Sequence, residues 1–443
     1  MSFIEDCRQI IGLDSTPGQG CLSVAEKLRS FAEEAGFHCD FYGENQQGLP
    51  QANLLIRPKS SNRKKELLLQ THMDTVEPGN YGSWTRTQAN PFQVNVYGDE
   101  MYGLGVADVK LDFMCKLEAA KSFAHEKNFK SPFVLAATYG AQTGMNGAIR
   151  LMRKKLIDAD RALIGEPTGL KVCASGMGLA TVDIFVPFGD QERAYRESHD
   201  LMESSSTQSK LFHGKAAHSS NPDSGENAIF KALDYLEQLP TGLAIMDFDG
   251  GINDNSVPPQ AFLEVDFVGD LKAPTAQKLI RIHKVIGQLR EKMREERDHR
   301  FEPNHSTLNL GTIRTTSDGV YISGSCRIPP SVDDGVYRSW MNEMGQVCAE
   351  VGGRFSVRDY RRGFDSSKSD FAKEVCDLAG MKAPLAIPTT TEASVFSKMG
   401  IACVVYGAGE SLGNSHQPNE MVRVSELNRS IEFYRSCIER FCL

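Results

Sequence analysis

Short apolar runs that alternate with helical patterns constrain the fold of this chain more than any other feature of its sequence. Segments such as Val24–Ala35, whose apolar residues recur at helical spacing, lie between runs that have the length of buried strands. Alternating strands and helices favour an α/β domain, with a mixed sheet and helices on both faces. The runs are Glu66–Gln70, Phe133–Thr138, Leu163–Ile164 and Ile401–Tyr406.

The middle of the sequence follows a different pattern and predicts a second, smaller domain. From residue 180 onward, strand-like alternation is mixed with helical patterns, and the polar, serine-rich segment 189–210 is typical of an inserted loop. Buried-strand patterns then return. The sequence therefore predicts an α/β domain formed by residues 1–174 and 362–443, interrupted by an α+β domain at 175–361.

Composition excludes several classes of function. The chain carries 49 basic and 57 acidic residues, a net charge of −8, which argues against binding nucleic acid through bulk positive charge. It has neither a run of about 20 apolar residues that could span a membrane nor a signal-peptide pattern at its start, so we expect a soluble, cytoplasmic protein. Its 11 cysteines are scattered and form no C-x-x-C pair. Free thiols are therefore expected, and any metal must be held by His, Asp and Glu side chains.

Side chains that can bind a metal follow the predicted strands. His72 and Asp74 come directly after one strand, Glu166 after another and His416 in a loop after a third, while Asp108 ends a glycine-rich segment before a helix. Open α/β sheets bind ligands at the carboxyl ends of their strands. His72 could bind a metal through one ring nitrogen while Asp74 orients it through the other. Taken singly, each residue also has an ordinary structural explanation, such as Asp108 acting as a helix N-cap.

Taken together, five segments resemble the zinc metallopeptidase family that includes acetylornithine deacetylase, succinyl-diaminopimelate desuccinylase, carboxypeptidase G and related aminoacylases and dipeptidases. The resemblance covers nearly the whole chain in order. The segments are THMDT at 71–75, GLGVADVK at 103–110, GEPT at 165–168, GKAAHSSNPDSGENAI at 214–229 and NSHQPNE at 414–420.

The resemblance implies a two-zinc site on the α/β domain, which would be the catalytic domain. Asp108 would bridge the two ions, His72 and Glu166 would complete one site, and His416 would serve the other. Such ions polarise an amide carbonyl and activate water at neutral pH. The middle domain would be a lid that often dimerises, and its His218 would stabilise the developing oxyanion, commonly in the active site of the partner subunit.

Three further residues fall in segments that match the family's pocket. Asn255 lies in GGINDNSVP, which resembles a family strand, and is a candidate contact to the substrate carboxylate. Arg327 could pair with the same carboxylate. Glu392 lies in a segment, TEAS, that resembles a pocket loop beside the metals. For each of the three, a purely structural role is an equal alternative.

The chain departs from the family at one segment. Where relatives carry two adjacent glutamates, in a segment like DEETSMAGA, this chain reads GAQTGMNGA at 140–148. The resemblance places Ala141 at the position of the general base and Gln142 at that of a zinc ligand. Alanine cannot accept a proton, and a positioned base typically contributes about 10²–10⁴-fold to the rate. Gln142 is a poor zinc ligand, so the site that it shares with His416 is expected to be weak.

Three interpretations remain open. The chain could be a zinc hydrolase whose base comes from Glu410 or from the substrate, a family member repurposed for another reaction or for binding, or an inactive subunit. We favour a metal-dependent hydrolase of N-acyl amino acids or small peptides, because four ligand residues are retained. The expected cofactor is one or two zinc ions, with cobalt or manganese as alternatives. The expected partners are a small-molecule substrate and a second copy of the chain, with neither nucleic acid nor membrane.

Overall fold

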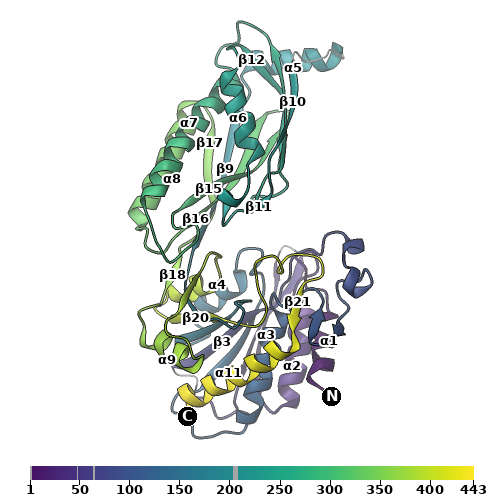
Figure 1. Cartoon of the computed structure of the whole chain (residues 1–443), viewed down its shortest axis with the longest axis vertical. Coiled ribbons are helices and arrows are strands. Elements are labelled where there is room, and N and C mark those ends of the chain that lie inside the picture. The colour runs from purple at the N-terminus through teal and green to yellow at the C-terminus, as the bar shows by residue number, and fades with distance from the viewer. Residues whose placement is uncertain (1, 47, 63–64, 203–207) are drawn as a thin grey trace. The chain divides into compact units, whose positions relative to one another are not determined.

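The computed structural model describes residues 2–46, 48–62, 65–202 and 208–443. It divides the chain into two compact units, each with its own apolar core (Figure 1). The first unit comprises Met1–Ser175, Phe364–Ala386 and Thr391–Leu443, and the second comprises Gly176–Gly363 and Ile387–Thr390.

A mixed sheet forms the centre of the first unit. Its strands are β1 His38–Gln46, β2 Leu49–Arg57, β3 Glu66–His72, β6 Phe133–Thr138, β7 Ala159–Gly165, β8 Cys173–Gly176, β18 Phe364–Asp365, β19 Leu385–Ile387 and β20 Ala402–Tyr406. They lie in the order β1-β2-β6-β3-β7-β20-β8-β18, with β19 beside β8. Strands β6, β3, β7 and β20 run parallel to one another, and β1 and β2 are antiparallel additions at one edge.

Helices cover both faces of this sheet. They are α1 Phe3–Ile11, α2 Leu22–Glu34, α3 Lys110–Ala120, α4 Asn146–Arg153, α9 Asp370–Leu378, α10 Ala393–Ser397 and α11 Val424–Cys442. Successive side chains of a strand point to opposite faces. Accordingly, Thr71 of β3 donates a hydrogen bond to Asp112 of α3, whereas its neighbour Gln70 donates to Glu392 at the start of α10. The predicted α/β class, with helices on both faces of a mixed sheet, is confirmed.

Smaller elements complete the first unit. A three-stranded sheet combines β4 Asn95–Tyr97, β5 Glu100–Tyr102 and β21 Met421–Arg423, and short 3-10 turns occur at Tyr81–Ser83, Thr85–Thr87 and Lys121–Phe123. Because β21 pairs with β5, the segment just before β21 is held next to the segment just after β5. These two segments carry His416 and Asp108 respectively.

The second unit is an antiparallel sheet with helices packed along it. The order of its strands is β10-β14-β12-β15-β16-β9-β17, and β11 pairs with β13 in a separate ribbon. Figure 1 shows the long helices α7 and α8 side by side along this sheet. The elements are β9 Gly178–Pro187, α5 Asp190–Met202, β10 Gln208–His213, β11 Ala217–His218, the 3-10 turn Pro222–Ser224, α6 Ala228–Gln238, β12 Leu243–Gly250, β13 Ser256–Val257, β14 Gln260–Phe267, α7 Thr275–Glu295, β15 Thr307–Thr315, β16 Gly319–Ile328, α8 Asp334–Glu350 and β17 Arg354–Arg361.

The expectation of a loop over 189–210 is wrong for most of that segment, which forms helix α5 and the start of β10. The helix is polar because it docks through hydrogen bonds rather than through an apolar stripe. The buried carboxylate of Glu192 accepts bonds from the backbone N–H of Ile245 and from the N–H and hydroxyl of Thr275. The serine-rich residues 204–207 lie outside the described ranges.

The boundary of the second unit also differs from the expected one at its late segment. Ile387–Thr390, expected in the α/β domain, belongs to the second unit. The cause is local, since Met177 donates its backbone N–H to Ile387, and Thr390 donates its hydroxyl to the carbonyl of Met177.

The cysteines carry free thiols, and Cys39 alone among them is not fully buried. In the part of the chain that the structure describes, no helix combines the length and apolar character that crossing a bilayer requires.

Candidate metal centre

The predicted ligands meet at one edge of the sheet in the first unit. In the parallel register, His72 at the end of β3 pairs with Thr138 at the end of β6, and Gly165 at the end of β7 pairs with Tyr406 at the end of β20. Parallel strands present their carboxyl ends at the same edge, where open α/β sheets bind ligands. The loops that follow these four strands therefore share one location.

His72, Asp108 and Glu166 form the core of this site. One ligand atom from each side chain lies within 4.8 Å of the others, so these atoms could hold a single ion. His72 and Asp108 are buried, and Glu166 is partly buried. One imidazole and two carboxylates make a donor set that suits zinc.

Asp108 lies between the two histidines. Its Oδ1 atom is 3.5 Å from Nε2 of His72, and its Oδ2 atom is 2.7 Å from Nε2 of His416. Nε2 of Gln142 lies 3.2 Å from the same nitrogen of His416. The structure thus brings together all the residues that the sequence proposed as ligands, with Asp108 at their centre.

The cluster contains several carboxylates close together, and their negative charges shift the pKa values of their neighbours. Burial opposes protonation of His72, but hydrogen bonds with Asp108 and Asp74 raise its pKa well above the usual value. Burial would raise the pKa of Asp108, yet His416 and His72 lower it. Burial raises the pKa of Glu166 to about 8, and the charge of Asp108 adds to this although His72 opposes it. A bound cation would relieve this repulsion between carboxylates.

Asp108 provides a direct test of whether the residues fit a cation. Its Oδ1 atom is buried and, with Nε2 of His72 3.5 Å away, accepts no hydrogen bond of ordinary length from the described residues. A buried charged oxygen without a partner is costly unless it is paired or coordinates a metal. The orphaned oxygen and the donor set around it fit a divalent cation.

Asp74 contacts the ring of His72, as the sequence suggested, and also binds the backbone of a neighbouring turn. Nδ1 of His72 is 3.0 Å from the backbone carbonyl oxygen of Asp74 and 3.4 Å from its carboxylate. The carboxylate also accepts hydrogen bonds from the backbone N–H groups of Ala141, at 3.0 Å, and Gln142, at 2.8 Å. Asp74 therefore fixes the turn that carries Ala141 and Gln142 as well as the ring of His72.

Glu392 lies beneath the cluster rather than in an open pocket. It is 1% exposed and accepts hydrogen bonds from the hydroxyl of Thr138, at 2.8 Å, and from the amide of Gln70. Burial raises its pKa to about 7, and His72 and Thr138 oppose this shift. Its neighbours are strands β3 and β6, so a supporting role fits it better than contact with a substrate.

Glu410 is placed away from the hydrogen-bonded cluster. Its carboxylate is 63% exposed and lies 3.7 Å from Nζ of Lys171. Like Glu392, Glu410 makes no described hydrogen bond to a proposed ligand.

Three residues of the second unit also meet one another. Asn255 Nδ2 is 3.1 Å from Nε2 of His218, and its Oδ1 accepts a hydrogen bond of 2.6 Å from Arg327. Arg327 also donates to the hydroxyl of Thr390 at 3.3 Å, whereas its buried Nε has no partner in the described ranges. Burial lowers the pKa of Arg327 to about 10. This group of His218, Asn255 and Arg327 offers donors to an anionic ligand.

Sequence reasoning missed Glu420 and Asn419. Both lie in the segment that supplies His416, and the sequence presents them only as part of its motif. Glu420 is 1% exposed and binds the backbone of the segment before Asp108. Its place in the NSHQPNE motif, four residues after His416, is the one signal that the sequence offers.

The fold and the donor set define an α/β protein with a candidate cation centre at the carboxyl edge of its sheet. The sequence model of peptidase family M20/M25/M40 matches residues 68–440, and the chain belongs to this family. The chain is therefore a member of a family of hydrolases that act on amide or peptide bonds.

Relatives with assigned names are similar over the whole chain. An acetylornithine deacetylase of Myxococcus xanthus is 22% identical over 449 residues, covering 98% of this chain and 96% of the relative. Another from Vibrio atlanticus is 25% identical over 462 residues, covering 100% of this chain and 99% of the relative.

Solved structures share the fold. An aminoacylhistidine dipeptidase from Vibrio alginolyticus superimposes with a TM-score of 0.64 at 16% identity, covering 99% of this chain and 96% of that one. A family M20 metallo-carboxypeptidase from Sulfolobus solfataricus gives a TM-score of 0.63 at 18% identity, covering 100% and 99%.

Proposed function

We propose that this chain is a zinc-dependent hydrolase of the amide bond in N-acyl amino acids or short peptides. The observation that carries the proposal is the group of His72, Asp108 and Glu166, whose ligand atoms lie within 4.8 Å of one another around an unpartnered oxygen of Asp108. Relatives named acetylornithine deacetylase, and a dipeptidase and a carboxypeptidase of the same fold, support this substrate class.

His72, Asp108 and Glu166 would hold one zinc ion, and His416 with Gln142 would complete a weaker second site around Asp108. When bound, zinc polarises the amide carbonyl of the substrate and activates water. The hydrogen bonds of Asp74 to Ala141 and Gln142, and its contact with His72, keep these residues in place.

Hydrolysis needs a general base that removes a proton from water, and this chain has none at the position expected for it. The resemblance to the family puts Ala141 where a general base would act, and a methyl group cannot take a proton. Glu410 remains the proposed substitute, although its carboxylate lies beside Lys171 in the structure. We therefore propose slow hydrolysis, handicapped by about 10²–10⁴-fold relative to a site with a positioned base.

Arg327 and Asn255 are the proposed contacts for the substrate carboxylate. The guanidinium of Arg327 is buried, its Nε is unpartnered among the described residues, and its described hydrogen bonds go to the neutral groups of Asn255 and Thr390. A buried guanidinium of this kind suits a bidentate carboxylate. His218 is the proposed donor to the oxyanion, with Asn255 holding its ring. Homodimerisation through the second unit remains a prediction.

A second candidate is a protein that binds a metal and an amino-acid-like ligand without turning it over. The presence of Ala141 and Gln142 beside an otherwise complete cluster favours it. Both candidates require the metal centre, and they differ only in turnover.

The deciding experiment measures zinc content and hydrolysis on the same purified chain. A panel of N-acetyl amino acids, an N-succinyl amino acid and dipeptides serves as substrates. The proposal expects slow turnover that a chelator abolishes and zinc restores. Zinc at full occupancy without turnover of any substrate would favour the binding protein, and absence of metal binding would refute both.

A further inference from the structure

The backbone of residues 103–108, which leads into Asp108, has an unusual set of hydrogen-bond acceptors. This segment is named the Asp108 loop here. Within it, Leu104 donates its N–H to Pro91 and Val106 donates to Gly103. The other four N–H groups, those of Gly103, Gly105, Ala107 and Asp108, all donate to one residue, Glu420.

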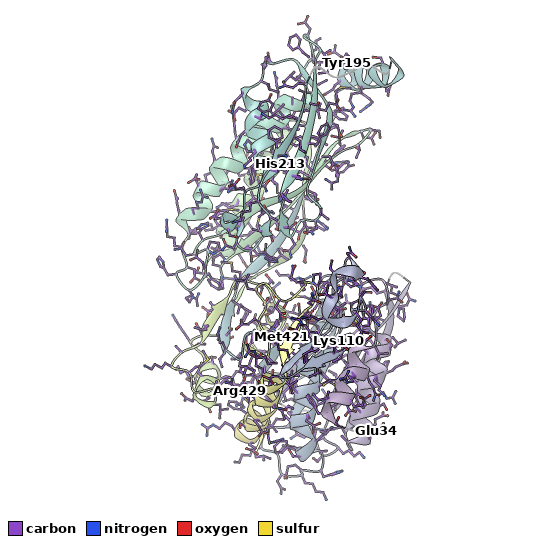
Figure 2. The ribbon with its side chains drawn as sticks, turned by 45° about the vertical axis from the view of Figure 1, so that its right-hand side comes forward. Glu34, Lys110, Tyr195, His213, Met421 and Arg429 are labelled. Carbon is purple, nitrogen blue, oxygen red and sulfur yellow. The ribbon has the colours of Figure 1, made fainter. Side chains whose placement is uncertain are left out.

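The geometry of these contacts is specific. Oε1 of Glu420 accepts from Ala107 at 2.8 Å and from Asp108 at 2.9 Å, and Oε2 accepts from Gly105 at 3.2 Å. The backbone carbonyl of Glu420 accepts from Gly103 at 3.2 Å. Met421, which Figure 2 labels, follows Glu420 directly and pairs with Tyr102, the residue just before the Asp108 loop.

Glu420 is costly to bury, because it is 1% exposed and its described hydrogen bonds are to backbone amides rather than to a basic side chain. Its carboxylate also lies against the segment that bears Asp108, which has the same charge. The three backbone N–H groups that donate to its carboxylate offset part of this cost.

Asn419, the preceding residue, makes a similar set of contacts on the other side. Its Oδ1 accepts the N–H of Arg86 at 2.8 Å, and its Nδ2 donates to the carbonyl of Ser83 and the hydroxyl of Thr85, both at 3.2 Å. The segment that carries His416 is therefore fixed at Asn419 to one loop and at Glu420 to the Asp108 loop.

We propose that Glu420 is the positioning residue of the metal centre: its carboxylate holds the Asp108 loop so that the Asp108 carboxylate is in place for a cation. Glu420 belongs to the same segment as His416, so it also sets the separation of these two ligands. The inference rests on the proposed function, since it concerns the centre that would bind zinc.

The test is Glu420→Gln, which keeps the shape of the side chain. A glutamine offers one oxygen and one NH₂ group, so at least one of the three loop N–H groups then faces a donor. The matched control is Glu426→Gln, because Glu426 accepts a backbone N–H from Gly409 at 3.0 Å and makes no described hydrogen bond to the Asp108 loop. Both variants are compared with the full-length wild-type chain.

Three quantities are measured: the zinc affinity by chelator competition, the visible spectrum of the cobalt-loaded protein, and the melting temperature of the metal-free protein. We expect Glu420→Gln to lose about 10–100-fold in zinc affinity, as for other residues that orient ligands, and to change the cobalt spectrum. Glu426→Gln is expected to keep wild-type affinity and spectrum, even if its melting temperature falls as much.

Wild-type zinc affinity and an unchanged cobalt spectrum in Glu420→Gln would overturn the inference and leave the proposed function intact. If the wild-type chain binds neither zinc nor cobalt, the proposed function fails and the inference falls with it. If Glu420→Gln does not fold, hydrogen exchange of the wild-type chain decides. Slow exchange at Ala107 and Asp108 is then expected, and exchange at the rate of an open loop would overturn the proposal.

Discussion

Nε2 of Gln142 lies 3.2 Å from Nε2 of His416, so a side-chain amide contacts the imidazole at the proposed second metal site. The same imidazole nitrogen is 2.7 Å from Oδ2 of Asp108. An amide carries no charge to balance a divalent ion, whereas a carboxylate at this position would. We therefore expect the identity of residue 142 to determine how tightly a second ion would be held.

The double change Ala141→Glu with Gln142→Glu tests this directly. We expect hydrolysis of an N-acyl amino acid to rise by about 10²–10⁴-fold, because a base is restored and the second ion gains an anionic ligand. The initial rate is measured at saturating zinc together with the zinc content.

The single change Ala141→Glu is the control for that experiment. Ala141→Glu alone is expected to gain less, since its base acts beside an incompletely occupied centre. Ordinary rates in the wild-type chain would mean that a substitute base exists, and Glu410→Gln is the first variant to examine. A double variant with full zinc and still no turnover would contradict the hydrolase proposal.

His72→Ala is expected to remove the tight zinc site. Changes to residues that merely orient ligands typically cost about 10–100-fold in metal affinity, so loss of a ligand is expected to exceed that range. Zinc content after dialysis, measured by mass spectrometry, reports the effect. His38→Ala is the control, because His38 is exposed and pairs with Asp40. Equal zinc in both variants would show that His72 is not a ligand.

The meeting of the candidate ligands at one edge of the sheet could be predicted because it depends on the strand pattern. Runs such as Leu67–Gln70 are buried on both faces, which identifies parallel strands in the middle of a sheet. Once the strands are parallel, residues directly after them meet at one edge whatever the details of packing. His72 and Glu166 illustrate this, since His72 is the last residue of β3 and Glu166 follows β7 directly.

Features that depend on tertiary hydrogen bonds could not be predicted in the same way. Helix α5 has few apolar residues, and Glu192 docks it onto Ile245 and Thr275, which are distant in sequence. The contacts of Glu420 are of the same kind, because they join residues more than 300 positions apart. A single sequence carries no local signal for such pairings.

Arg327→Met is expected to weaken binding of substrates that carry a free α-carboxylate. Loss of a buried charged donor predicts at least a tenfold rise in KM, about 1.4 kcal/mol or more. A substrate whose carboxylate is replaced by an amide is expected to lose no affinity, which separates ligand binding from a general structural effect. The control is Arg358→Met, since Arg358 is exposed and pairs with Asp183 and Asp254. Equal KM changes for both substrates would refute the assignment.

Glu392 is expected to make the first unit less stable as the pH rises. Burial raises its pKa from 4.5 to about 7, so between these values the folded state keeps a proton that the unfolded state releases. Stability is then full below pH 4.5 and falls by about 3 kcal/mol on passing pH 7.

Glu392→Gln cannot titrate, so we expect its free energy of unfolding to change less over this range. The measurement is urea unfolding of the metal-free chain, followed by tryptophan fluorescence. Both proteins carry Trp340→Phe, so that Trp84 reports on the first unit alone, and one of them also carries Glu392→Gln. Parallel pH profiles for the two proteins would show that the buried carboxylate stays ionised, held by its bonds to Gln70 and Thr138.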